Sequence, residues 1–229
     1  MGLEPLCLGI KRGEFRANDA NAKQADLVFE AVRNNALRLH GYRCVRCSYE
    51  SAADVKGTRK SKLQVHHLDD DHHNNEPENL TPHCSLDHAY HHIGCDAKTP
   101  GGSMGWASQM RIAYAPEVTA EDLNLLQRAC GAAVTSDDER EIALEIVGLL
   151  GVLAGPVKDV FGSFQAKDFA AVFSKMSAAE YAQRHDYVDG LRVLFHPDIL
   201  RAVGQEFLED ARLFPVKSWE GVANGLRIA

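Results

Sequence analysis

Long apolar runs are missing from this sequence. No stretch reaches the roughly 20 consecutive apolar residues that a membrane-spanning helix needs. The first residues also lack a basic segment followed by an apolar one, which is the pattern of a secretory leader. Together these absences favour a soluble, cytoplasmic protein that does not insert directly into a membrane.

Basic side chains are missing from residues 63–92, which hold six acidic residues and no lysine or arginine. The imbalance extends over the chain: residues 1–62 carry 12 Lys and Arg against 7 Asp and Glu, and residues 63–229 carry 13 against 25. Tight binding of nucleic acid depends on Lys and Arg that neutralise phosphates. The acidic stretch therefore argues against strong, unaided binding to nucleic acid.

Metal-ligating residue types are instead concentrated between Cys44 and His92. Eight of the eleven histidines and three of the six cysteines lie in this segment. In a chain without an evident secretory leader, such a concentration favours metal binding over a disulfide framework.

The cysteine spacing predicts a structural Zn²⁺ site. Cys44 and Cys47 are separated by two residues, so that a tight turn can present both thiolates to one tetrahedral ion. Cys84 supplies a third thiolate. Either Asp87 or His88 completes the set, because a carboxylate and an imidazole both ligate zinc. The sequence leaves that choice open.

Local patterns around these ligands predict two short strands followed by a helix. The helix would place His88, His91 and His92 on one face, because they are three and four residues apart. Two strands and a helix around a metal ion form a ββα-metal unit. The expected bounds are 63–68 and 79–81 for the strands, 69–78 for their polar connection and 82–92 for the helix.

The order and spacing of His66-His67, Asn79 and His88 resemble the HNH endonuclease motif. The resemblance implies that His66 and His88 hold a divalent cation such as Mg²⁺ or Mn²⁺. It also implies that His67 is the general base and that Asn79 braces the loop that orients it. A neutral imidazole can take a proton from water near pH 7, and a cation stabilises the charge that develops on a cleaved phosphate.

A wider resemblance covers most of the chain and is firmest over residues 40–135. The segments that carry it are Tyr42–Glu50, Asp69–Leu80, Gly101–Asn124 and Ala211–Pro215, which are similar to the IcmJ/DotN family of type IVB secretion systems. The family implies an HNH-like zinc fold in a cytoplasmic coupling complex. There it docks on the C-terminal tail of the coupling ATPase and, with other coupling-complex subunits, helps recruit substrates. Members bind zinc through four cysteines and can lack the nuclease histidines, whereas this sequence has Asp87 and keeps His66, His67 and His88.

The rest of the chain has mainly helical patterns. Ser136 and Glu139 form a capping-box pattern, which predicts a helix start, and Pro156 is expected to end that helix. Strands are expected at 5–16 and 109–113, and helices at 22–40, 119–134, 136–154, 157–164, 168–176 and 197–211.

The predicted fold class is α+β, with an HNH-like ββα-metal zinc module within a mostly helical chain. Residues 1–135 would form the zinc-binding region together with the N-terminal strand and helix. Residues 136–229 would form a helical region that packs on it or continues the same domain. Two functions follow from these expectations: a zinc-binding component of a coupling complex, or a metal-dependent HNH endonuclease that cleaves DNA.

Overall fold

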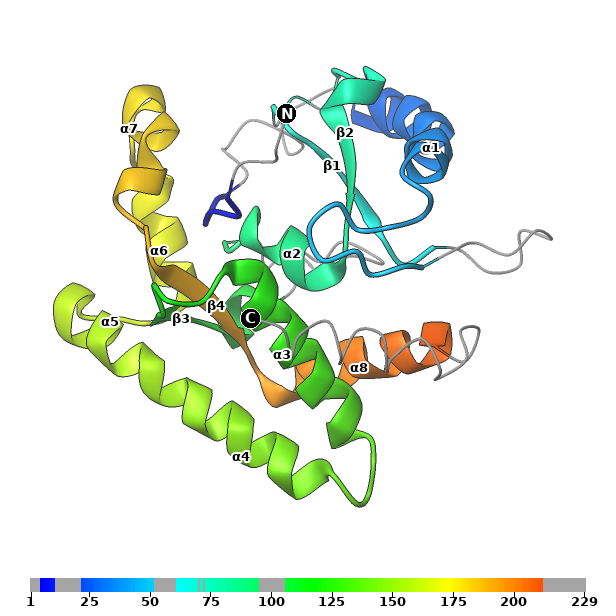
Figure 1. Ribbon diagram of the computed structural model, residues 1–229. Helices are drawn as coiled ribbons and strands as arrows, with labels where there is room; N and C mark the ends of the chain where they lie inside the picture. The colour runs from blue at the N-terminus through cyan, green and yellow to red at the C-terminus, as the bar shows by residue number, and fades with distance from the viewer. Residues whose placement is uncertain are drawn as a thin grey trace.

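The structure combines helices with two small antiparallel sheets, so the fold is α+β as expected (Figure 1). The computed structural model describes residues 5–10, 22–51, 61–69, 71, 73–94 and 106–211. Among these residues, no helix has both the length and the apolar character needed to cross a lipid bilayer.

The first sheet lies between two helices. β1 and β2 are antiparallel, with His66 opposite Thr81 and His67 opposite Leu80. Because successive strand residues point to opposite faces, the sheet presents one histidine of the pair to each neighbouring helix. In chain order the elements of this part are α1 (Ala22–Leu39), β1 (Gln64–His67), η1 (Pro77–Asn79), β2 (Leu80–His83) and α2 (Ser85–Tyr90).

The second part is mostly helical and surrounds a second two-stranded sheet. β3 and β4 pair antiparallel, with Ile112 opposite Val193, although about 80 residues separate them in the chain. The elements are η3 (Ala107–Gln109), β3 (Met110–Tyr114), α3 (Ala120–Val134), α4 (Arg140–Gly151), η4 (Val152–Ala154), α5 (Gly155–Phe161), α6 (Ala166–Phe173), α7 (Ala178–Ala182), η5 (Arg184–Asp186), β4 (Leu191–Phe195) and α8 (Pro197–Ala211).

One hydrophobic core connects the two parts. Leu86 and Tyr90 of α2 belong to the same buried cluster as Val193 of β4. The Val193 N–H donates a hydrogen bond of 2.9 Å to the Tyr90 hydroxyl, and the Phe195 N–H donates one of 2.9 Å to Oε1 of Gln127. Side chains from α2 and α3 thus satisfy backbone groups of β4 that would otherwise be buried without partners. The division of the chain at residues 135 and 136 stays a prediction.

Several predicted elements are confirmed, and others differ. The helix expected at 22–40 is α1, and Thr119 caps α3 by accepting a hydrogen bond from the Asp122 N–H. Ser136 caps no helix, because α4 begins at Arg140. Pro156 does not end helical structure. It lies in the first turn of α5, where backbone N–H groups make no hydrogen bond within the helix, so that proline is tolerated there.

Two strand expectations also differ from the structure. Residues 5–10 form no strand, and the rest of the expected strand at 5–16 lies outside the described residues. β4 was not expected, because its five residues lie among helical patterns and its partner β3 is distant in the sequence.

Helices α3 and α8 pack at backbone distance. A Cβ atom added at Gly131 of α3 would lie 2.1 Å from the carbonyl oxygen of Leu200. A Cβ atom added at Gly204 of α8 would lie 2.1 Å from the carbonyl carbon of Gly131. Only glycine permits this approach of the two helices.

Gly131→Ala is therefore expected to lower the free energy of unfolding by about 2–3 kcal/mol, because a methyl group must force the helices apart. Gly148→Ala in α4 is the matched control, since a Cβ atom there meets nothing within 4 Å. It should be neutral or stabilise by up to about 1 kcal/mol through helix propensity. Urea denaturation measures both, and equal stability of Gly131→Ala and the wild type would contradict the packing described.

Candidate metal centres

Cys44 and Cys47 lie in a tight turn between α1 and β1. The Ser48 N–H donates to the carbonyl oxygen of Cys44 at 3.0 Å, which closes the turn. The Val45 N–H donates to the carbonyl oxygen of Pro82 at 3.0 Å, which attaches the turn to β2. The two thiols are thereby held beside the start of α2.

Cys84 and Asp87 come from the first turn of α2. Cys84 is the N-cap residue, and its Sγ accepts a hydrogen bond of 3.5 Å from the Asp87 backbone N–H. An anionic sulfur is favoured at this position, because unpaired N–H groups and the helix dipole meet there. Asp87 is fully buried, which is unusual for a carboxylate without a cation or hydrogen-bond donors.

The four side chains converge on one point. Sγ of Cys47 and Sγ of Cys84 are 3.7 Å apart, close to the roughly 3.8 Å expected between two sulfurs on a tetrahedral zinc ion. Oδ2 of Asp87 lies 3.0 Å from Sγ of Cys44 and 3.1 Å from Sγ of Cys84. All four ligand atoms are within 4.8 Å of one another. The structure thus groups Asp87 with the cysteines and places His88 in a different group.

Two side chains of α3 enclose these ligands. Arg128 donates through Nη2 to Sγ of Cys84 at 2.6 Å and through Nη1 to Sγ of Cys47 at 3.4 Å. Asn124 Nδ2 donates to Oδ1 of Asp87 at 2.7 Å, which leaves Oδ2 directed at the cysteines. Three thiolates and a carboxylate around a divalent ion carry a net charge of about −2, and the buried guanidinium offsets part of it.

The charges of this group depend on one another. Hydrogen bonds with Cys44 and Cys84 lower the pKa of the Cys47 thiol, and Arg128 acts in the same direction. Burial raises the pKa of the Cys84 thiol and raises the pKa of Asp87 to about 6. A bound cation would favour the deprotonated form of all four side chains, so metal binding would release protons.

A second group consists of buried imidazoles. His66 of β1, His88 of α2 and His92 bring ring nitrogens within 4.8 Å of one another. His88 lies in α2, and His92 lies in the turn that follows it, where the His92 N–H donates to the carbonyl oxygen of Ala89 at 3.1 Å. His91 stacks on His66 with 4.0 Å between ring centroids, and His83 lies edge-on to His66 at 5.5 Å.

Burial disfavours the charged form of three imidazoles in this cluster, His83, His88 and His91, and a neutral imidazole is the form that binds metals. Burial lowers the pKa of His88 and His91, neighbouring histidines add to the effect, and burial lowers the pKa of His83 to about 3. Within the described residues, Nδ1 of His88 is buried without a hydrogen-bond partner, which costs about 1–3 kcal/mol unless another ligand satisfies it. An all-imidazole set suits Zn²⁺, Ni²⁺ or Cu²⁺ better than the expected Mg²⁺ or Mn²⁺, which prefer oxygen ligands.

His67 does not join this group. It points to the face of the sheet opposite His66, where its ring centroid lies 5.0 Å from that of Phe29 in α1. Its Nε2 lies 3.2 Å from Oδ1 of Asn75, and the side chain is buried. The two adjacent histidines therefore have different surroundings.

Asn79 braces the connection between β1 and β2. Its Nδ2 donates to Oδ1 of Asp69 and to the carbonyl oxygen of Asn74, both at 2.8 Å. Its Oδ1 accepts from the Asp69 N–H at 3.1 Å. The same connection carries Asn75, which contacts His67. The Asn79 side chain thus holds the connection between β1 and β2 in place.

The structure divides the six predicted metal ligands between two groups. It also adds a further ligand candidate and two residues that contact the ligands, none of which was predicted in these roles. Cys44, Cys47, Cys84 and Asp87 form the first group, and His66 and His88 belong to the second. His92 was missed as a ligand, although its four-residue spacing from His88 is visible in the sequence. Asn124 and Arg128 were missed because they lie on α3, whose packing on α2 is a tertiary feature.

Comparison of the chain with protein-family models found no match, and comparison with curated proteins found none either. The chemical interpretation of the two groups therefore rests on their geometry and donor sets.

Arg128→Met is expected to weaken zinc binding by about 10–100-fold, as is typical when a residue that contacts metal ligands is replaced. The cause is the loss of a buried positive charge and two donors to sulfur. Arg128→Lys should give an intermediate loss, because it keeps the charge but not the forked geometry. Competition with a chromophoric chelator measures the affinity. Arg201→Met, at a half-buried arginine of α8 that pairs with Asp198, is the control, and an equal effect of both substitutions would contradict the role of Arg128.

Proposed function

We propose that the chain is a metal-stabilised scaffold built on an HNH-like ββα-metal unit. It acts in the cytoplasm, peripheral to the membrane, as a component of the coupling complex of a type IVB secretion or conjugation system. It docks on the C-terminal tail of the coupling ATPase, joins other coupling-complex subunits and supports substrate recruitment. The resemblance of residues 40–135 to the IcmJ/DotN family supports this assignment.

The Cys44–Cys47–Cys84–Asp87 group is the observation that carries the scaffold role. Its four ligands would fill all positions of a tetrahedral Zn²⁺ ion, and α3 encloses them. Catalytic zinc sites keep one position open for water or substrate, whereas closed sites are structural. The ion would connect the turn at Cys44, α2 and α3, which are distant in the sequence.

Exposed apolar side chains support a docking role. Only Ala143 of the twelve residues of α4 is buried, while Ile142 and Leu149 are 62% and 64% exposed. Large apolar patches on soluble proteins commonly mark interaction surfaces. The acidic character of the chain also suits a protein partner better than nucleic acid.

Binding to the purified C-terminal tail of the cognate coupling ATPase tests this function. The zinc-loaded chain is expected to form a stable complex in size-exclusion chromatography. Cys44→Ser should abolish both zinc retention and the complex, because metal-binding energy at such a site is folding energy. His67→Ala should leave the complex intact. A folded, zinc-loaded chain that does not bind the tail would contradict the proposal.

A second candidate function is metal-dependent cleavage of DNA by an HNH endonuclease. The group of His66, His88 and His92 favours it, because a cation held by three imidazoles would keep coordination positions for water and a phosphate oxygen. The bracing by Asn79 also supports it. In this function His67 would act as the general base. Oδ1 of Asn75 accepts from Nε2 of His67, so the proton of a neutral ring lies on Nε2, and Nδ1 is the nitrogen that would take a proton from water.

Plasmid nicking separates the two functions. An active enzyme is expected to nick DNA with Zn²⁺, Ni²⁺, Mn²⁺ or Mg²⁺, and His67→Ala should reduce the rate at least about 100-fold, as expected for a general base. His92→Ala should reduce the apparent metal affinity. His185→Ala, at an exposed histidine paired with Asp186, is the control. No nicking with any of these metals by a protein that retains zinc in the cysteine group would rule out the enzyme.

A further inference from the structure

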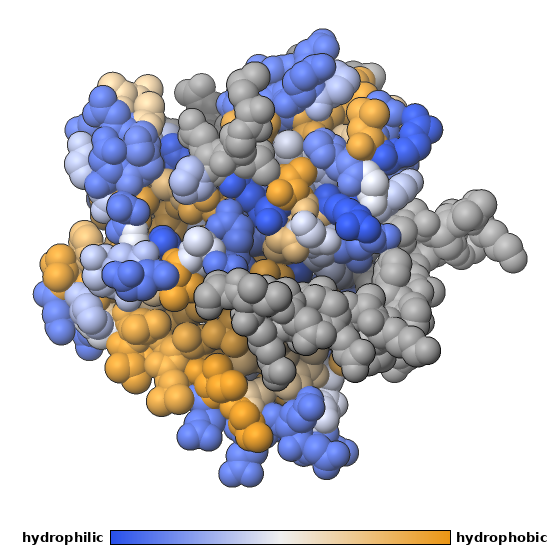
Figure 2. Space-filling model, in the orientation of Figure 1, coloured by the Kyte–Doolittle hydropathy of each residue, from blue (hydrophilic) through white to orange (hydrophobic). Residues whose placement is uncertain are grey.

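The α4–α5 surface is an exposed apolar stretch formed by Ile142, Leu149, Val152, Val160 and Phe161. These side chains are between 54% and 75% exposed. Figure 2 shows hydrophobic residues gathered over α4 and α5, in the lower left of the view. Large apolar side chains are normally buried, and an exposed patch of them commonly marks a surface that a binding partner covers.

Glycines along the same helices leave the backbone open. A Cβ atom added at Gly148, Gly151 or Gly155 would meet nothing within 4 Å. Glycine inside a helix costs about 1 kcal/mol relative to alanine. The close contact of α3 with α8 explains why glycine is needed at Gly131 and Gly204. For the glycines of α4, no contact within the described residues gives such a reason. A partner backbone that approaches α4 closely would account for them.

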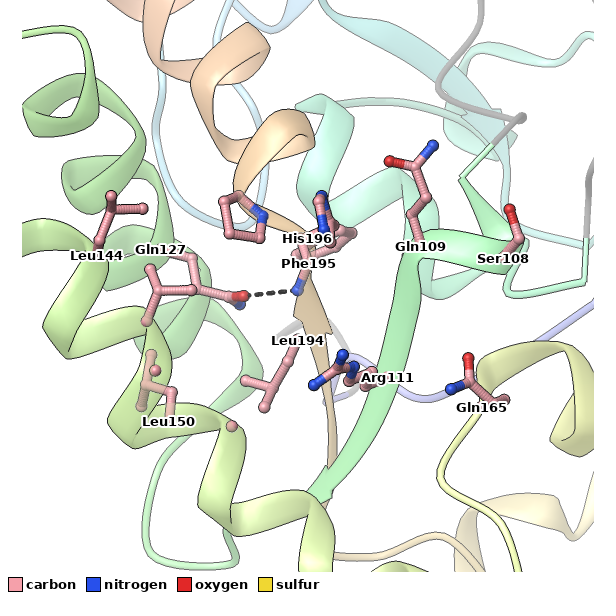
Figure 3. A pocket seen from close by; sticks show the side chains of 14 residues that line it. Ser108, Gln109, Arg111, Gln127, Leu144, Leu150, Gln165, Leu194, Phe195 and His196 are labelled. Atoms are coloured by element: carbon pink, nitrogen blue, oxygen red, sulfur yellow. Dashed lines mark hydrogen bonds between the residues drawn. The ribbon is translucent and has the colours of Figure 1, made fainter.

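A groove runs beside α4. A cavity of about 550 Å³ lies between α4 and the β3–β4 sheet (Figure 3). Leu144 and Leu150 of α4 line one side, and Leu194 of β4 and Arg111 of β3 line the other. Two smaller cavities, of about 330 and 180 Å³, share Phe161. A helix lying along α4 could place large apolar side chains into these cavities.

The charged residues beside the α4–α5 surface indicate which kind of partner would fit it. Residues 137–145 contain five acidic residues and one arginine, residues 146–157 contain no charged residue, and α5 adds one charge of each sign, Lys158 and Asp159. Asp186 and Asp189 flank the exposed Tyr187, which lines the two smaller cavities. An apolar strip with acidic margins complements a helix with an apolar face and basic flanks. The same margins would repel a second copy of this acidic surface and an anionic lipid surface.

We propose that the α4–α5 surface binds an amphipathic, basic helix of a partner protein. The inference deepens the proposed scaffold function and rests on it for the identity of the partner. The apolar face of the helix would cover Leu149 and Val152 and insert side chains into the groove beside α4. Its basic residues would face the acidic residues at the margins.

Leu149→Asp tests the surface, with Leu27→Asp as a matched control. Both leucines are in helices, at 64% and 63% exposure, and Leu27 lies on α1 at the other end of the molecule (Figure 1). The probes are the coupling ATPase tail, a synthetic leucine–lysine amphipathic helix and its leucine–glutamate counterpart. Isothermal titration calorimetry gives the dissociation constants, and sedimentation gives the oligomeric state.

The inference expects the tail to bind, with at least 10-fold loss in Leu149→Asp and none in Leu27→Asp. Equal binding to all three proteins would overturn the surface and leave the scaffold function standing. If the tail does not bind the wild type, the scaffold function fails. In that case the synthetic peptides test the surface. The surface is supported if the wild type binds the leucine–lysine helix but not the leucine–glutamate helix, and if Leu149→Asp removes this binding. Any other result overturns the surface. A dimer that Leu149→Asp dissociates would also overturn it in favour of self-association.

Discussion

A buried cluster of three cysteines and an aspartate lies at the centre of the structure, and the deprotonated forms of these side chains need compensating positive charge. Cys44 and Cys47 come from a turn, and Cys84 and Asp87 come from the start of α2, whose Leu86 and Tyr90 pack in the main hydrophobic core. Burying a carboxylate among thiols is unfavourable unless a cation and hydrogen-bond donors compensate. Arg128 supplies a fixed part of that charge, and a divalent ion would supply the rest.

The same cluster links the two halves of the chain. Arg128 and Asn124 lie on α3, which also packs on α8 through Gly131. Tyr90, at the end of α2, supports β4 from the other side. Disturbance of the ligand group should therefore affect the helical part as well.

Much of the ligand set could be predicted from the sequence, because short spacings determine it. The Cys44–Cys47 turn and the helix that starts after Cys84 are local features. The choice between Asp87 and His88 was left open by the sequence: adjacent residues of a helix point about 100° apart, and the contact of Asp87 with Asn124 of α3 is a tertiary feature. The opposite orientations of His66 and His67 follow from strand alternation, but the neighbours of each ring do not.

The helices were easier to predict than the strands. α1, α3 and α8 have periodic apolar positions or capping residues, whereas β4 is a five-residue strand whose partner is distant in the chain. The capping pattern at Ser136 was misleading, since the helix begins only at Arg140. Tertiary pairing determines such short elements more than local preference does.

X-ray absorption at the zinc edge tests the central claim most directly. One equivalent of Zn²⁺ bound to the purified chain should show three sulfur neighbours at about 2.3 Å and one oxygen at about 2.0 Å. Asp87→Ala should remove the oxygen and keep the sulfurs. A first shell made of nitrogen alone would place the ion in the histidine group and contradict the structural role assigned to the cysteines and Asp87.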